Sequence, residues 1–306
     1  MKKIDKLILI YFYICECYDT TLAAHCQRMS NNYQPKFTDQ EVLTIFFYCL
    51  IVERRFEIKD IYEFADTYLR FSFPDMVDSY EGFLTRINNL HEVFPVICQL
   101  LLEAKMKTTN PESVRLYQGV IASVVDSMPI ILAKGFRSAS AKVAPEYCDK
   151  GYCASKNLFY YGLKLHVMGF SLFDKLPLTE FIGTSPASYN DLTVFKPQWE
   201  SLNDRAIFAD KIYASKAFEE WLLENNNLQI LTPVKKKKGQ KELSYFDKIY
   251  SKLVSQIRQP IEAFFNWIIQ KVGIQNASKV RSKKGLFVHV YGRFAAALMI
   301  LNFDVF

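Results

Sequence analysis

The stretch GVIASVVDSMPIILA, residues 119–133, decides the fold, because it is a long apolar run interrupted by one carboxylate. Residues 119–125 predict a buried strand that ends at Asp126, and residues 130–133, behind Pro129, predict a second one. Continuous apolar runs of this length are typical of strands that are covered on both faces. The sequence therefore predicts two short buried strands, with an acidic residue where the first of them stops.

Strands and helices alternate after this stretch. Apolar runs predict further strands at residues 159–170, 178–182, 206–209 and 228–231. Helical spacing and capping residues predict helices at residues 190–199, 215–224, 248–272 and 291–301. This alternation indicates an α/β fold, in which helices cover the faces of a sheet.

The first third of the chain has a different pattern, with apolar residues spaced by three and four along residues 1–105. Such spacing is typical of helices. Thr38 and Glu41 form a T-x-x-E capping box that opens one helix. Further helices are expected at residues 58–69, 80–90 and 93–101. The turn-rich stretch KTTNPES at 107–113 then predicts a boundary between a helical domain, residues 1–112, and an α/β domain, residues 113–306.

Composition limits the class of protein. Half of the 306 residues are apolar and 15% are aromatic, which excludes a disordered chain. A net charge of +6 permits a polyanionic partner. Seven cysteines, an odd number in apolar contexts, predict reduced thiols in a cytosolic protein. The start MKKIDKLILIYFYICECY resembles a signal peptide, but Asp5 and the missing cleavage site favour a soluble intracellular protein without membrane attachment.

Three acidic residues are the candidates for chemistry. Asp126 and Asp210 each follow an apolar strand, so their carboxylates meet at one edge of the sheet if the two strands are parallel neighbours. Glu262 lies beside the apolar stripe of the helix at 248–272, one turn after Arg258, which would contact it or a phosphate. Pro260 predicts that Glu262 lies near a helix start or a bend. Such a set of carboxylates suits Mg²⁺ or Mn²⁺, in a two-ion arrangement for phosphodiester chemistry.

The motifs VVDSMPI at 124–130 and FADKIYAS at 208–215, followed by a helix with R-x-x-x-E, resemble the DDE transposases of bacterial insertion sequences, in particular the nine-eighty-two family. The resemblance extends to YYGLKLHVMG at 160–169, SYNDL at 188–192 and GRFAAALMILNF at 292–303. It implies an RNase H-like mixed sheet of the retroviral-integrase superfamily. It also implies metal-dependent cleavage at transposon ends and strand transfer into target DNA.

The same resemblance assigns the acidic triad to Asp126, Asp210 and Glu262, which would hold two Mg²⁺ or Mn²⁺ ions. The related signature Tyr-x₂-Arg-x₃-Glu-x₆-Lys is matched only by Arg258 and Glu262, because Ser255 and Ile269 stand at its Tyr and Lys positions. Roles of those two signature residues therefore do not carry over. Three alternatives stay open: a nuclease or resolvase that cuts without joining, a catalytically silent DNA-binding protein, and a protein attached to a membrane by its N-terminal segment.

Double-stranded DNA is the expected partner, as terminal inverted repeats and as target, with a homodimer on DNA and a cytoplasmic, nucleoid-associated location. The helical domain is expected to contain a helix-turn-helix, although no residue there is assigned. The basic residues expected to contact DNA, beside Arg258, are Lys235, Lys236, Lys237, Lys238, Lys271, Lys279, Arg281, Lys283 and Lys284.

Other polar residues receive structural interpretations. Asp191, together with Asn190, is interpreted as a helix cap. His166 shares a strand face with Lys164, which predicts a structural or DNA-facing role for the imidazole. Cys148 and Cys153 have no second Cys or His pair nearby, so a zinc site is not expected there.

Overall fold

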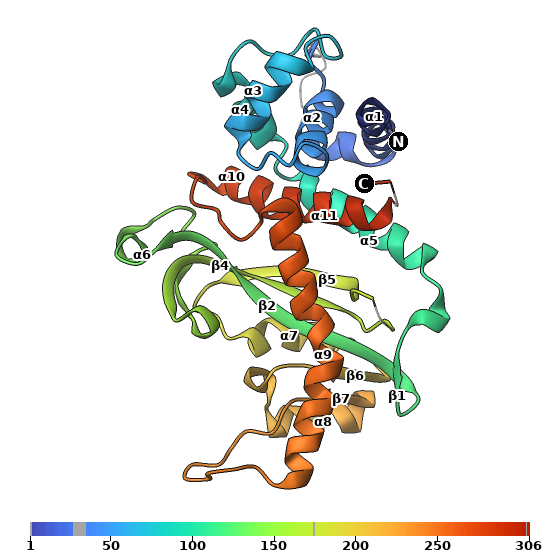
Figure 1. Ribbon diagram of the computed structural model, residues 1–306, viewed down its shortest axis with the longest axis vertical. Coiled ribbons are helices and arrows are strands. Elements are labelled where there is room, and N and C mark those ends of the chain that lie inside the picture. The colour runs from blue at the N-terminus through green and yellow to red at the C-terminus, as the bar shows by residue number, and fades with distance from the viewer. Residues whose placement is uncertain (1, 27–34, 174, 304) are drawn as a thin grey trace. The chain divides into compact units, whose positions relative to one another are not determined.

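The computed structural model describes residues 2–26, 35–173, 175–303 and 305–306 (Figure 1). Their contacts divide the chain into two compact units. We call Met1–Lys105 with Ile268–Phe306 the helical unit, and Met106–Trp267 the sheet unit. The predicted boundary at 107–113 lies next to the end of the first segment. Residues 268–306, which the sequence analysis placed in the second domain, group instead with the N-terminal helices.

Within its described residues, the helical unit consists of helices alone. Their bounds are α1 (Lys3–Thr20), the short 3₁₀ helix η1 (Leu22–Cys26), α2 (Asp39–Ile51), α3 (Ile58–Tyr68), α4 (Tyr80–Asn89), α5 (Val93–Thr108), α10 (Lys283–Phe287), the π turn η5 (Val288–Gly292) and α11 (Arg293–Asn302). The predicted capping box opens α2: Thr38 N donates to Glu41 Oε2 at 2.6 Å, and Glu41 N donates to Thr38 Oγ1 at 3.3 Å. Helix α2 forms the centre of the unit, where Phe46 and Phe47 pack against Phe94.

The C-terminal helices α10, η5 and α11 form one run, Lys283–Asn302, which begins eight residues before the predicted helix at 291–301. By length and composition alone this run is able to cross a membrane. However, 67% of its most apolar window is buried, and the buried residues include Phe294 and Leu298 of α11. Burial of this kind is typical of the core helix of a folded unit.

The sheet unit contains a mixed sheet, and its strands in the described part of the chain are β1 (Leu116–Tyr117), β2 (Val120–Lys134), β3 (Asp149–Cys153), β4 (Leu158–Phe170), β5 (Leu178–Pro186), β6 (Arg205–Phe208) and β7 (Leu228–Leu231). The strand order is β3-β4-β2-β6-β7, with β5 also paired to β4 and β1 to β2. Strands β2, β3, β4 and β5 pair in antiparallel fashion, whereas β6 is parallel to both β2 and β7. The expected mixed α/β sheet is therefore present.

The prediction of two short strands on either side of Pro129 is wrong. Residues Val120–Lys134 form one strand, β2, of 15 residues. On one side β2 pairs with β4 along nearly its whole length. On the other side β6 pairs only with Ile121 to Val124. Beyond Val124 no described strand pairs with that edge, so β2 is an edge strand at Pro129. Proline lacks a backbone donor and is tolerated at edge positions of a sheet.

Helices flank the sheet: α6 (Arg137–Ser140), α7 (Asp191–Trp199), α8 (Lys216–Asn226) and α9 (Tyr245–Val272), together with the 3₁₀ helices η2 (Pro111–Ser113), η3 (Ala154–Lys156) and η4 (Lys211–Tyr213). On α7, Phe195 and Trp199 stack with their ring centroids 5.6 Å apart and pack with Val125, Ile207 and Tyr213 in one core. Figure 1 shows α9 passing across β2. Residues Tyr245–Trp267 of α9 belong to the sheet unit, and its last turn belongs to the helical unit.

Candidate active site

Asp126 lies in the middle of β2 and not at a strand end, which corrects the sequence interpretation. Its partner in the antiparallel register is Val167 of β4. The parallel pairing with β6 stops at Val124 and Phe208, and two residues beyond these positions stand Asp126 and Asp210. Asp126 and Asp210 therefore lie at the same level, just beyond the paired part of two neighbouring parallel strands, which is the arrangement expected for a shared site.

Asp210 begins the 3₁₀ helix η4 as its N-cap. Its Oδ1 accepts a hydrogen bond from the backbone N–H of Lys211 at 2.7 Å. This contact orients the carboxylate locally, because a capping side chain satisfies a donor that the helix leaves without an internal partner. The strand that precedes it, β6, is fully buried from Ala206 to Phe208. A rigid core element thus holds a partly exposed acid.

Glu262 is joined to Asp126 through Arg258. The Arg258 guanidinium donates to Asp126 Oδ2 at 2.8 Å and also to Glu262 Oε1, one helical turn further along α9. The side chain of Arg258 is 14% exposed, that of Asp126 is 22% exposed and that of Glu262 is 51% exposed. The spacing R-x-x-x-E thus places one cation between a strand carboxylate and a helix carboxylate.

Of the two positions expected from Pro260, the helix start is wrong, because α9 is continuous through this proline, and the bend stays a prediction. Glu262 lies seventeen residues (262 − 245) after the first residue of α9, and not near its start. Helix α9 was itself predicted from residue 248 to 272, close to the observed bounds. The helix therefore presents Glu262 from its middle turns.

Burial raises the pKa of Asp126 to about 6. The Arg258 guanidinium and the backbone N–H of Ser127 act in the opposite direction, and the carboxylates of Asp210 and Glu262 raise the pKa further. A like charge raises the pKa of an acid only when it lies close by. The three acids therefore share one electrostatic environment.

Oxygen donors and an excess of negative charge are what Mg²⁺ and Mn²⁺ select. Asp126, Asp210 and Glu262 fit such an ion in donor type and in charge. In the geometry described, however, no group of three His, Cys, Asp or Glu side chains among the described residues is arranged to hold a metal ion. At this site Arg258 contacts Asp126 and Glu262 and supplies the positive charge between them.

Asp191 has a structural environment that was not predicted. Of the two residues interpreted as a helix cap, Asn190 is confirmed, with its Oδ1 accepting from the N–H of Leu192 at 2.9 Å, and Asp191 is instead the first residue of α7. Asp191 is 6% exposed and accepts hydrogen bonds from Lys164 Nζ at 2.8 Å and from Ser127 Oγ at 3.0 Å. A buried polar network therefore stands directly behind Asp126, since Ser127 is its neighbour on β2. The signal was present in SYNDL and YYGLKLHVMG, which carry Asp191 and Lys164.

Of the two roles predicted for His166, structural or DNA-facing, its surroundings agree with the structural one. The ring is fully buried, and its Nε2 lies 2.7 Å from Ser185 Oγ of β5. Burial lowers the pKa of His166 to about 4, against the opposing effect of Asp191. A buried ring does not reach DNA, so the DNA-facing interpretation is wrong. Cys148 and Cys153 are free thiols.

The four lysines at 235–238 are exposed in the loop that leads into α9. The beginning of the loop lies against α9, because the N–H of Val234, next to Lys235, donates to Ser251 Oγ at 3.0 Å. Ser251 lies eleven residues (262 − 251) before Glu262, which corresponds to about 16 Å at 1.5 Å per residue of helix. DNA contact by this loop remains a prediction.

The second basic segment belongs to the helical unit, and its members are Lys271, Lys279, Arg281, Lys283 and Lys284. Arg281 donates to the carbonyl oxygens of Ser278 and Val280, and Lys284 donates to Asn89 Oδ1 at 2.9 Å. The carboxylates belong to the sheet unit. This segment therefore belongs to a different unit from the carboxylates, and its contact with DNA stays a prediction.

A family model described as a transposase DDE domain matches residues 122–299. The matched range covers more than half of the chain and includes Asp126, Asp210 and Glu262. It implies an RNase H-like fold, which agrees with the mixed sheet of the sheet unit. No curated protein and no solved structure matches the chain.

Proposed function

The chain belongs to the transposase DDE domain family, and we propose that it cuts DNA at the ends of a mobile element and joins them to target DNA with Asp126, Asp210 and Glu262. One observation carries the proposal. Asp126 and Asp210 stand two residues beyond the last pair of the parallel ladder between β2 and β6, and Arg258 joins Asp126 to Glu262. A shared site of three acids is also supported by the pKa of Asp126, which both Asp210 and Glu262 raise.

Asp126, Asp210 and Glu262 would hold two Mg²⁺ or Mn²⁺ ions. When bound, such ions activate a water or a 3′-hydroxyl and stabilise the leaving oxygen. Asp126 is held by the ladder between β2 and β4, and Asp210 by its cap on η4. These two residues orient the reacting phosphodiester relative to the sheet, while Glu262 closes the site from α9.

Arg258 has two roles in this proposal. Without a metal ion, its guanidinium neutralises Asp126 and Glu262. When the carboxylates of Asp126 and Glu262 hold a metal ion, Arg258 would lose these contacts and would be available to a phosphate of the DNA. The negative charge of the carboxylates would thus be balanced by Arg258 without the metal ion and by the metal ion when it is bound. This balance is needed because a buried carboxylate without a positive partner is costly.

Ser127, Asp191 and Lys164 act as positioning residues. Metal ligands are held in place by hydrogen-bonded partners around them. Asp191 links Lys164 of β4 to Ser127 of β2, so it fixes the strand segment that carries Asp126. Loss of this link would loosen the carboxylate without removing it.

The remaining parts of the proposal concern the assembly. The helical unit would bind the terminal inverted repeats, and the lysines at 235–238 would contact the DNA backbone. A homodimer on DNA would hold two element ends during transfer. The protein would work in the cytoplasm, on the nucleoid.

The test uses purified protein with Mg²⁺ or Mn²⁺, a labelled DNA that carries the end of its own element and a second target DNA. Cleavage and joining are measured for the wild type and for Asp126→Asn, Asp210→Asn and Glu262→Gln. Glu224→Gln, which changes an exposed acid of α8, serves as the matched control. We expect the wild type and the control to cut and join, and each triad variant to lose both activities while remaining folded.

The outcomes separate the alternatives. Cutting without joining would identify a nuclease or resolvase. DNA binding without any cutting would identify a silent DNA-binding protein. If the three triad variants cut as well as the wild type, the assignment of the catalytic residues is wrong.

A further inference from the structure

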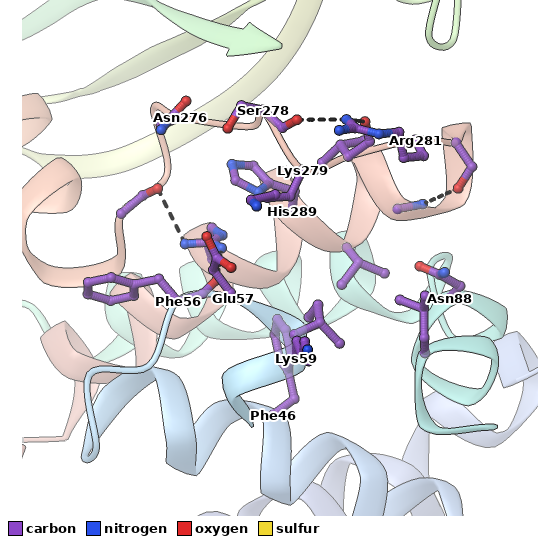
Figure 2. A pocket seen from close by; sticks show the side chains of 18 of the residues that line it. Phe46, Phe56, Glu57, Lys59, Asn88, Asn276, Ser278, Lys279, Arg281 and His289 are labelled. Carbon is purple, nitrogen blue, oxygen red and sulfur yellow. Dashed lines mark hydrogen bonds between the residues drawn. The ribbon is translucent and has the colours of Figure 1, made fainter. Parts of the chain in front are cut away.

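The helical unit contains a pocket of about 640 Å³ (Figure 2). Pockets for small ligands usually have volumes of this order. One wall comes from the start of α3 and from α4, and the other from the segment between Gly273 and Arg293. Figure 2 shows Lys279 and His289 on the latter wall, opposite Lys59 and Asn88. The proposed function gives this pocket no role.

The lining of the pocket is strongly basic. It includes Lys59, Lys279, Arg281 and Arg293, against a single acid, Glu57. Lys59 pairs with Glu63 at 3.7 Å. Arg281 is held by carbonyl oxygens of its own loop, and in the described part of the chain no carboxylate forms an ion pair with the other lining cations. The pocket therefore offers positive charge to an anion.

Arg293 places a buried charge at the base of this pocket. It is 8% exposed and donates to the carbonyl oxygens of Val272, at 2.6 Å, and of Phe56. Burial lowers the pKa of Arg293 to about 10, and the nearby carboxylate of Glu57 acts in the opposite direction. His289, also in the lining, is neutral, because burial and the charge of Arg293 move its pKa well below the ordinary value. An anion that enters the pocket would therefore add to the partial compensation that Glu57 gives to the buried guanidinium.

The backbone beneath the pocket has an unusual conformation. Val288–Gly292 form a π turn inside the C-terminal helical run, and such turns are found often at functional sites. Gly273, with φ of 63°, lies so that a Cβ would approach Arg293 Nη1 and Phe56 Cγ at 3.1 Å. Close contacts between backbone and side chains therefore fix the position of the guanidinium.

The remaining lining residues suit a flat aromatic ring that carries hydrogen-bonding groups along its edge. Phe46, Phe56 and Tyr80 supply aromatic surface, and the amides and hydroxyls come from Asn88, Asn276, Ser278 and Ser282. Unpaired nucleic-acid bases stack on aromatic side chains and form hydrogen bonds along their edges. Cationic side chains next to such a surface bind the phosphate. Aromatic, amide and cationic groups in one pocket are thus the chemistry of a nucleotide site.

We propose that this pocket binds one unpaired nucleotide of the DNA substrate, with its phosphate at Lys279 and Arg281 and its base between the two walls. The inference rests on the proposed DNA substrate. A DNA strand fits better than a free nucleotide because the basic segment continues past the pocket through the exposed Lys283 and Lys284, with no acidic residue between 271 and 284. A continuing backbone would follow these side chains.

The test compares binding of the full chain to a paired duplex and to the same duplex with one unpaired 2-aminopurine, by anisotropy and by 2-aminopurine fluorescence. We expect the wild type to prefer the unpaired substrate about tenfold, as typical for one stacked base. Lys279→Ala and Ser278→Trp change exposed lining residues and should abolish the preference. Lys36→Ala, an exposed lysine of the same unit outside the pocket, should keep it. An equal preference in all variants, or none in the wild type, overturns the proposal.

Two further arms separate this inference from the proposed function. Asp126→Asn should lose cleavage and keep the preference, because Asp126 belongs to the other unit. A wild type that prefers unpaired DNA but never cuts leaves the inference standing and refutes the catalytic proposal, and one that cuts but shows no preference does the reverse. Free deoxyadenosine monophosphate provides the last arm: if it binds in the pocket while unpaired DNA is not preferred, the ligand is a small nucleotide and the DNA proposal is wrong.

Discussion

A guanidinium with little exposure lies at the carboxylate site of the sheet unit and another at the pocket of the helical unit, and the two differ in their partners. Arg258 in the sheet unit forms ion pairs with two carboxylates, Asp126 and Glu262. Arg293 in the helical unit donates its hydrogen bonds to carbonyl oxygens, among them those of Val272 and Phe56. The first cation is balanced by ion pairs, whereas the second lies in a lining that has more cations than acids. In the two proposals, a metal ion would replace the first guanidinium at its carboxylates, and an anion would bind near the second.

The largest expected effect comes from removing the guanidinium that donates to carbonyl oxygens. Arg293→Met leaves the carbonyls of Val272 and Phe56 without their donor, in a site that is 8% exposed. We expect a loss of about 4 kcal/mol in the free energy of unfolding, since each of the two buried carbonyls left without its donor costs about 1–3 kcal/mol. Urea denaturation measures it, with the exposed Arg281→Met as control. A loss below about 1 kcal/mol would show that the carbonyls find other donors.

The next effect concerns the pH dependence of stability caused by His166, a buried neutral ring, in contrast to the buried cation of Arg293. The pKa of His166 is lowered by burial to about 4, so the folded state resists protonation more than the unfolded state, whose pKa is the ordinary 6.5. Above pH 6.5 both states are neutral and no penalty exists. As pH falls from 6.5 to 4, only the unfolded state gains the proton, and stability falls by about 3 kcal/mol.

Urea denaturation between pH 7 and pH 4 measures this change. His166→Gln removes the titrating group, so its unfolding free energy should decline by about 3 kcal/mol less than that of the wild type over the same range. If both proteins decline equally, other groups are responsible and His166 is not held neutral by burial.

A smaller effect is expected behind the carboxylate site. Asp191→Asn weakens the bonds from Lys164 and Ser127 but keeps Asp126, Asp210 and Glu262 in the chain. We expect the cleavage rate to fall by roughly 10- to 100-fold, the usual cost of losing a partner that orients a metal ligand. The rate is measured at saturating Mn²⁺, and Glu224→Gln is the control. An unchanged rate in a folded variant would remove Asp191 from the positioning network.

The smallest effect on stability should come from replacing Arg258, the guanidinium that pairs with two carboxylates. Arg258→Gln removes contacts to Glu262, which is 51% exposed, and to Asp126, whose pKa of about 6 would rise further. Asp126 would then take up a proton instead of remaining an unpaired charge, so the unfolding free energy near neutral pH should change by less than about 1 kcal/mol. Mn²⁺ affinity, measured by calorimetry, should rise because no guanidinium competes for the two carboxylates. Weaker Mn²⁺ binding would mean that Arg258 helps to hold the ion site together.

Much of this arrangement can be predicted from local sequence. Thr38 and Glu41 mark the start of α2, because a capping box is a local feature. The apolar run before Asp210 predicts β6, and the four-residue spacing of Arg258 and Glu262 predicts their contact on α9. These features depend on residues close together in the chain.

Other features depend on distant parts of the chain and could not be predicted. The length of β2 follows from where β6 stops pairing, which makes Pro129 acceptable within a strand. Asp191 looks like a helix cap until β4 and β2 bring Lys164 and Ser127 to it. The segment 268–306 joins the N-terminal helices through tertiary contacts, which periodicity does not reveal.

The position of Asp126 in the middle of β2 has a consequence for how the site adjusts during a reaction. Its backbone is locked into the ladder with β4 on both sides along the strand, so it moves only if the sheet itself opens. Asp210 follows a strand end, and Glu262 projects from the surface of a helix. In the proposed reaction, Asp126 would therefore be the fixed reference point of the three, and successive phosphodiesters would be accommodated by movement of the other two acids around it.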